Sequence, residues 1–159
     1  MPEITDLLRQ EHDEALTLAD RLCREEEDAK ARREIFHQLK DALTLHSRAE
    51  EAAVYEALKG CKDDDEAVKM GHEGYVEHSL VDYLFEKLTR SSATTSPSWS
   101  AHAMVLKELL EHHVEEEQGE AFDLLEKHFD AAAREKMAQA FLAAKDSAAS
   151  SAKSSRSAA

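Results

Sequence analysis

Glycine, proline and cysteine are scarce in this sequence of 159 residues. There are four glycines, two prolines and two cysteines, whereas alanine, leucine, glutamate and lysine dominate. Few helix breakers and many helix formers predict a nearly all-helical protein, and strand patterns are missing throughout. Cys23 and Cys61 form no Cys-x-x-Cys pair and would make a poor disulfide framework, which is typical of a reducing compartment.

Long apolar runs and an excess of positive charge are also missing. No stretch approaches the roughly 18 to 20 apolar residues of a transmembrane helix. The N-terminal MPEITDLLRQEHDE carries acids where a signal peptide has a basic and then an apolar run. Acidic residues number 34 against 20 basic ones, for a formal net charge of -14, which disfavours nucleic acid or an anionic membrane as a partner. We therefore expect a cytoplasmic protein, monomeric or weakly dimeric, with no nucleic-acid or membrane partner.

Apolar residues recur with the three-and-four spacing of amphipathic helices. The length fits one domain, and we expect an all-α fold, an up-down-up-down antiparallel four-helix bundle with a short fifth helix, over residues 1–145. The expected helices cover about 4–27, 32–59, the end of GCKDDDE to 88, 99–128 and 131–145. The connecting loops are expected at REEEDAK, GCKDDDE and SSATTSPS, and Pro97 or Ser98 opens the fourth helix. The low-complexity residues 146–159 are predicted to be a disordered tail.

Histidines interrupt the apolar stripes, and an internal repeat aligns them. EHDEALTLADRL lies over EHSLVDYLFEKL at an offset of 66 residues, from 11 to 77, and HSRAEEAAVYEALK lies over HVEEEQGEAFDLLE at 67 residues, from 46 to 113. Residues equidistant from the turn of a hairpin lie side by side, and the midpoints between His12, His46, His78 and His113 all fall in predicted loops. The bundle would therefore bring these four histidines to one level, facing inward from four helices.

The segment EHHVEEEQ contains two overlapping His-x3-Glu frames, His112/Glu116 and His113/Glu117. At about 100° per residue, His113 lies at the centre of the apolar stripe and His112 lies about 100° to one side. The repeat also aligns His113, not His112, with His46. We therefore predict that His113 and Glu117 face the core, with His112 and Glu116 flanking them.

Imidazoles and carboxylates buried in a helical core cost several kcal/mol unless they are paired or bind a metal. One such histidine would be read as a satisfied core residue, but six groups at one level favour a metal site. The predicted ligands are His12, His46, Glu50, His78, His113 and Glu117. They exceed the needs of one tetrahedral zinc and suit two octahedral ions with one or two positions left open. Manganese or zinc could occupy similar ligands.

The same residues resemble the hemerythrin-like domains with the HHE cation-binding pattern. The motifs that match in order and spacing, over about residues 3–145, are His12, His46-x3-Glu50, Glu77-His78 and His113-x3-Glu117. The resemblance implies a non-haem centre of two iron ions, oxo- or hydroxo-bridged, with the four histidines as terminal ligands and Glu50 and Glu117 as bridges. It also implies a small diatomic or peroxide ligand, since a reduced iron pair binds dioxygen in this family.

One position departs from that pattern. Oxygen-carrying hemerythrins have His-x3-His on the third helix, but the residue four before His78 is Gly74. Tyr75, the less well placed His72 or water could fill the space. The missing imidazole argues against reversible oxygen carriage and favours catalase-like or peroxidase-like peroxide decomposition, nitric-oxide handling or sensing. The alternatives are an iron-storage or iron- or oxygen-sensing interaction module without turnover, and a purely structural bundle.

Overall fold

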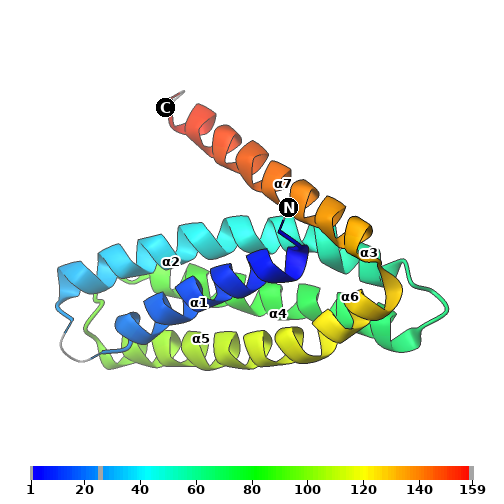
Figure 1. Cartoon of the computed structure of the whole chain (residues 1–159). Helices are drawn as coiled ribbons and strands as arrows, with labels where there is room; N and C mark the ends of the chain where they lie inside the picture. Colours follow the sequence, from blue (N-terminus) through cyan, green and yellow to red (C-terminus); the bar gives the residue numbers. More distant parts are fainter. Residues whose placement is uncertain (1, 25–26, 158–159) are drawn as a thin grey trace.

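The computed structural model describes residues 2–24 and 27–157, with the backbone alone for 152–157. Five helices make up this part of the chain, and no strand occurs in it. The first, third and fifth helices are α1 (Ile4–Leu22), α4 (Asp65–Arg90) and α7 (Ala131–Ser157). The second helix is continuous and consists of α2 (Ala29–Glu50), the π-helical turn η1 (Glu51–Tyr55) and α3 (Glu56–Lys59). The fourth consists in the same way of α5 (Pro97–Glu116), the π-helical turn η2 (Glu117–Ala121) and α6 (Phe122–His128). Figure 1 shows α1, α2, α4 and α5 lying side by side.

Side-chain caps fix where three of these helices begin. The Asp28 carboxylate accepts from the backbone N–H of Ala31 at the start of α2, and Asp64 does the same for the first turn of α4. Ser96 caps α5, with Pro97 in the first turn, where a missing N–H costs nothing. These starts agree with the predicted ones within a few residues. The first predicted loop includes residues 25–26, which lie outside the described residues.

Two apolar clusters lie on either side of a polar layer. One contains Leu8, Tyr55 and Phe122, and the other contains Phe36 and Trp99. Each of α1, α2, α4 and α5, with their continuations, passes from one cluster to the other through a buried histidine, and the order of the clusters alternates from helix to helix. This alternation is compatible with the predicted up-down-up-down bundle.

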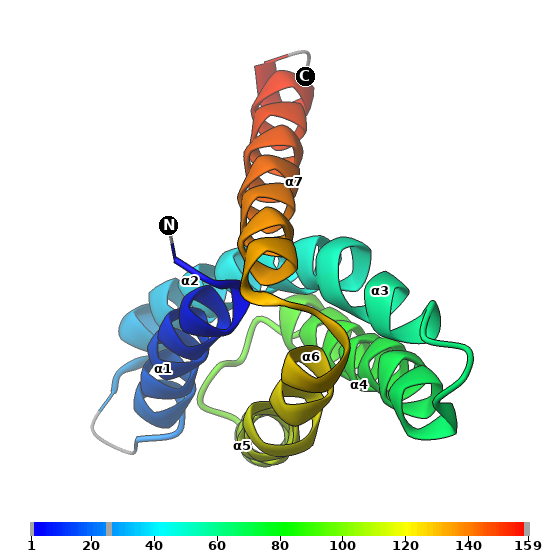
Figure 2. The same ribbon diagram turned by 45° about the vertical axis from the view of Figure 1, so that its right-hand side comes forward.

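The C-terminal helix differs from the prediction. α7 packs on α1, α2 and η1 and then leaves the bundle, as Figure 2 shows. It continues to Ser157 and does not end near Lys145, so residues 146–157 are helical where we expected a disordered tail. The helix can continue because no glycine or proline occurs between Ala131 and Ser157 and alanine has the highest helix propensity. None of the described helices has both the length and the apolarity to cross a bilayer.

Candidate metal centre

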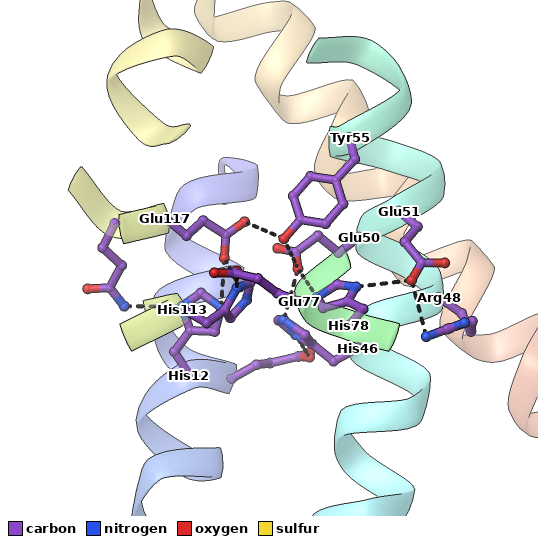
Figure 3. A network of polar contacts seen from close by, with 12 residues as sticks. His12, His46, Arg48, Glu50, Glu51, Tyr55, Glu77, His78, His113 and Glu117 are labelled. Carbon is purple, nitrogen blue, oxygen red and sulfur yellow. Dashed lines mark hydrogen bonds and ion pairs between the residues drawn. The ribbon is translucent and has the colours of Figure 1, made fainter. Parts of the chain in front are cut away.

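The four predicted histidines meet in the centre of the bundle (Figure 3). The ring of His12, on α1, lies 5.1 Å from that of His46 on α2 and 5.8 Å from that of His113 on α5, centroid to centroid. His78, on α4, lies 5.3 Å from His113. All four side chains are buried. The four rings thus lie at one level along the bundle axis, as the positions of the loops predicted.

Two buried glutamates complete the cluster, and each lies between two histidines. Oε2 of Glu50 is 3.4 Å from Nε2 of His46 and 3.3 Å from Nε2 of His78. Oε2 of Glu117 is 3.1 Å from Nε2 of His12 and 3.5 Å from Nε2 of His113. The structure therefore brings together all six residues that the sequence singled out.

Apart from Nε of Arg32, the buried side-chain atoms without hydrogen-bond partners in the described structure all belong to this cluster. They are Nε2 of His12, His46, His78 and His113, Oε1 of Glu50 and Oε2 of Glu117. Polar atoms buried in this way cost free energy unless something satisfies them. Imidazole nitrogens and carboxylate oxygens are suitable ligands for a transition metal, so the residues fit a metal centre.

Carboxylates outside the cluster orient three of the rings. The pairs are His46 Nδ1 with Glu11 at 3.0 Å, His78 Nδ1 with Glu51 at 3.0 Å and His113 Nδ1 with Glu77 at 2.6 Å. An ionised carboxylate only accepts hydrogen bonds, so Nδ1 must carry the proton and donate it. In the neutral ring Nε2 then keeps its lone pair, which is the arrangement that metal-binding histidines have.

His12 is the exception among the four. Its Nδ1 lies 3.2 Å from Nε2 of the Gln118 side chain, and the oxygen of that amide accepts from Arg9 at 3.3 Å. An amide N–H₂ donates, so in this arrangement Nδ1 of His12 accepts and Nε2 carries the hydrogen, towards Glu117. A metal on Nε2 of His12 would require the amide of Gln118 to turn over.

Burial and the neighbouring charges move the pKa values of the histidines in opposite directions. Burial lowers the pKa of His12 to about 3, so this ring is neutral. Burial also opposes the charge on His46, but the Glu50 carboxylate, followed by the hydrogen bonds with Glu11 and Glu50, raises the pKa of His46 to about 9. Without a metal, both ring nitrogens of His46 are therefore protonated at neutral pH, and the ring is positively charged.

The two buried glutamates also differ in pKa. Burial and the nearby Glu50 charge raise the pKa of Glu117 well above its ordinary value. Glu50 is desolvated as well, but His46 and its hydrogen bonds hold the pKa of Glu50 well below the ordinary value. The charge on one of two neighbouring carboxylates disfavours ionisation of the other, so Glu50 is ionised and Glu117 is protonated. The metal-free cluster thus retains protons at positions that a metal would occupy.

Tyr55 is the member of the site that the sequence reading missed. Its buried hydroxyl donates to Oε2 of Glu50 at 3.1 Å and lies 3.5 Å from Oε1 of Glu117. Burial and these carboxylates raise the pKa of the phenol well above its ordinary value. A Cβ atom on Gly74 would overlap the Tyr55 ring, so Tyr55 occupies the space that the missing histidine leaves.

The two residues proposed for that space are elsewhere. The Tyr75 hydroxyl donates to Glu56 at 2.7 Å, away from the cluster, and His72 is exposed. Tyr55 was overlooked because a regular α-helix at about 100° per residue turns it about 140° away from Glu50, five residues earlier. The π-helical turn η1 stacks residue i+5 over residue i and brings both side chains to one face.

The internal repeat extends to the outer residues of the site, with three differences. The second π-helical turn, η2, begins at Glu117 as η1 begins directly after Glu50. Equivalent positions in the two halves carry Glu51 and Gln118, Tyr55 and Phe122, and Gly74 and Leu8. In the structure, His78 therefore has a carboxylate and a phenol as neighbours, whereas His12 has an amide at the position equivalent to the carboxylate, and the sequence position equivalent to the phenol carries a phenyl ring.

The overlapping frames in EHHVEEEQ separate as predicted. The His113 side chain is 7% exposed and that of His112 is 61% exposed. Nε2 of His112 lies 3.3 Å from Oε2 of Glu116, outside the buried cluster. Glu117 is 3% exposed, so His113/Glu117 is the frame that faces inward.

A small cavity adjoins the four rings. Its volume is about 10 Å³, and apolar side chains such as Leu43, Val81 and Leu110 line it together with the histidines. About one water molecule requires a space of roughly 10 to 15 Å³ on this measure. The cavity is therefore about the size of one water molecule.

Helices that surround a buried cluster of histidines and glutamates define a class of metal-binding bundle proteins. The sequence model of the hemerythrin HHE cation binding domain matches residues 3–125 of this chain. The protein belongs to this family, whose domains bind metal cations, typically iron. Searches of curated proteins and of solved structures find no match.

Proposed function

We propose that the buried cluster holds two iron ions joined by an oxide or hydroxide. The terminal ligands are His12, His46, His78 and His113, and the bridges are Glu50 and Glu117. Support comes from the six inward atoms without partners and from the placement of each glutamate between two histidines. The glutamates at positions 11, 50, 51, 77 and 117 supply negative charge that two such cations would balance.

We propose that this centre reacts with hydrogen peroxide, and that disproportionation into water and dioxygen is the reaction it supports best. An iron pair supplies two electrons and takes them back. The surrounding residues must then exclude bulky reductants and hold protons. The cavity of about 10 Å³ has room for about one water molecule, so it excludes organic substrates and favours very small ligands. Dioxygen and nitric oxide are similar in size to peroxide and are expected to bind at the same place.

The single observation that carries this proposal is the Tyr55 hydroxyl between the two glutamates. Turning two molecules of peroxide into two of water and one of dioxygen requires protons to leave one molecule and reach another. The Tyr55 phenol keeps its proton and donates a hydrogen bond to Glu50, so this hydroxyl is the group beside the centre that can hold and pass on a proton. The Tyr55 ring lies beside Gly74, the position at which an oxygen carrier of the family has an imidazole ligand.

Oxygen evolution tests the proposal. Iron-loaded protein in excess hydrogen peroxide should release many molecules of dioxygen per chain at an oxygen electrode, and elemental analysis should give two irons per chain. A protein that is merely bleached after one equivalent of peroxide does not disproportionate it. A metal-free chain, or one with a single zinc, would refute the di-iron centre itself.

A second candidate function, an iron- or oxygen-sensing module, has its own structural support. Lys145 on α7 forms an ion pair with Glu11, and Glu11 holds Nδ1 of His46. The ring of Phe141, one turn earlier on α7, lies 5.8 Å from that of His46. Metal on His46 would therefore change the contacts that dock α7. Protease resistance of α7 that depends on iron, without peroxide turnover, would favour this function.

A further inference from the structure

Three side chains with metal-ligating atoms meet at the surface next to the buried cluster. His112 and Glu116 lie one turn apart on α5, and Glu77 reaches them from α4. One ligand atom of each lies within 4.8 Å of the other two. The His112 side chain is 61% exposed, Glu116 37% and Glu77 17%, so the group is open to solvent.

The spacing matches a first coordination shell. Nε2 of His112 is 3.3 Å from Oε2 of Glu116 and 3.9 Å from Oε1 of Glu77. Ligands of tetrahedral zinc, at about 2.0 to 2.2 Å from the ion, are roughly 3.4 Å from one another. Small rotations of exposed side chains would close the remaining difference. One histidine and two carboxylates leave the fourth position to water, as in sites with three protein ligands.

The negative charges of Glu77 and Glu116 also favour binding of a cation. Within the part of the chain that the structure describes, histidines are the only basic side chains within 4 Å of Glu77 or Glu116. The two carboxylates are thus held together without a lysine or arginine to neutralise them.

We propose that Glu77, His112 and Glu116 form a second metal site on the surface, which takes one divalent transition-metal ion such as zinc. Glu77 links this outer site to the buried cluster, because its Oε2 accepts from His113 while its Oε1 faces His112. An ion in the outer site draws negative charge from Glu77 and weakens the hydrogen bond that orients His113. The outer site itself does not require the buried cluster to hold iron.

Zinc counting tests the outer site. The metal-free full-length chain is dialysed against micromolar free zinc, and bound zinc is measured by elemental analysis for wild type and for His112→Ala/Glu116→Gln. The control is His37→Ala/Asp41→Asn, which removes an exposed His-x3-Asp pair on α2 that belongs to no such three-group cluster among the described residues. Circular dichroism checks that all three chains are equally helical.

We expect wild type and control to bind one more zinc per chain than His112→Ala/Glu116→Gln. Equal zinc in all three proteins overturns the site, as does an equal loss in both variants. Because the result is a difference, it stands whatever number of ions the buried cluster takes up. Zinc added to iron-loaded protein should also shift the visible absorption of wild type and not of the outer-site variant. If iron never binds, the absorption measurement cannot be made and the proposed di-iron function fails. The zinc count still tests the outer site in that case.

Discussion

The ring of Tyr55 fills the space beside Gly74, on the neighbouring helix. Three atoms of that ring are the nearest neighbours of a Cβ atom built on Gly74, and all of them are too close for a side chain to be accommodated. The phenol of Tyr55 can therefore be buried next to Glu50 only because residue 74 has no side chain. The departure from the histidine pattern of oxygen carriers is thus a substitution of one polar group for another, supplied by a different helix.

Gly74→Ala should destabilise the protein, because an added methyl group meets a rigid aromatic ring in a packed core. Overpacking of this kind costs about 1 to 3 kcal/mol of unfolding free energy. Urea unfolding of the metal-free chain measures it. Tyr55→Ala in the same chain should remove the added cost of the alanine at 74. The matched control is Gly119→Ala, since nothing lies within 4 Å of a Cβ atom there. Equal effects at the two glycines would contradict the fit described here.

Tyr55→Phe should keep the fold and the iron and lower peroxide turnover about a hundredfold or more, as is typical of removing a positioned proton donor. The ring still fills the space at Gly74, and Phe122 already occupies the equivalent position of the other half. Tyr75→Phe is the control, since that hydroxyl bonds Glu56 outside the cluster. Oxygen evolution per iron separates the two variants. Unchanged turnover in Tyr55→Phe would remove the phenol from the mechanism.

His113→Ala should lose iron, whereas His112→Ala should keep most of it. Only the first ring has its Nε2 atom inside the buried cluster. Iron per chain after reconstitution and desalting gives the answer directly. The opposite result would reverse the assignment of the two frames. Both variants need equal helical content by circular dichroism for the comparison to count.

Metal uptake should release protons, and metal affinity should rise with pH. The pKa of His46 is raised to about 9 in the metal-free protein, so the ring must lose a proton before Nε2 can bind a metal. The gain in affinity from this group should level off above pH 9. Calorimetry in two buffers of different ionisation enthalpy counts the protons, and more than one is expected at neutral pH because Glu117 also holds one. Uptake with no proton release at neutral pH would show that His46 is neutral.

The same pKa shifts bear on the stability of the metal-free protein, with opposite signs. The raised pKa of His46 stabilises the folded state fully below about pH 6.5, and this contribution is lost as the pH rises through about 9. The lowered pKa of His12 costs nothing above about pH 6.5 and destabilises the folded state as the pH falls towards 3. Glu11→Gln should move the alkaline loss to lower pH, as followed by thermal unfolding.

The histidine level could be predicted from the sequence because it depends only on helix periodicity and on where the loops lie. The choice of His113 over His112 depends on the same periodicity, and the exposure of the two rings agrees with it. Prediction failed where periodicity breaks, at the π-helical turns. A uniform 100° per residue cannot place Tyr55, which is the last residue of such a turn.

The carboxylates that orient the rings were present in the repeat but were not recognised. Glu11 and Glu77 directly precede His12 and His78, and each bonds the histidine of the next helix, His46 or His113. The duplicated Glu-His pair was the signal for them, because an acid kept in both halves next to a buried ligand needs a partner. The end of α7 was missed for another reason, since composition alone does not distinguish a low-complexity tail from an alanine-rich helix.

The differences between the two halves of the repeat bear on how the centre would fill. His78 is next to the Glu51 carboxylate and the Tyr55 ring, whereas His12 is next to the Gln118 amide. A cation gains more from the first set, and the second requires an amide to turn over first. If the centre holds two ions as proposed, the ions therefore bind one after the other. The first ion binds on the side of Tyr55, and a chain with one ion is a distinct species.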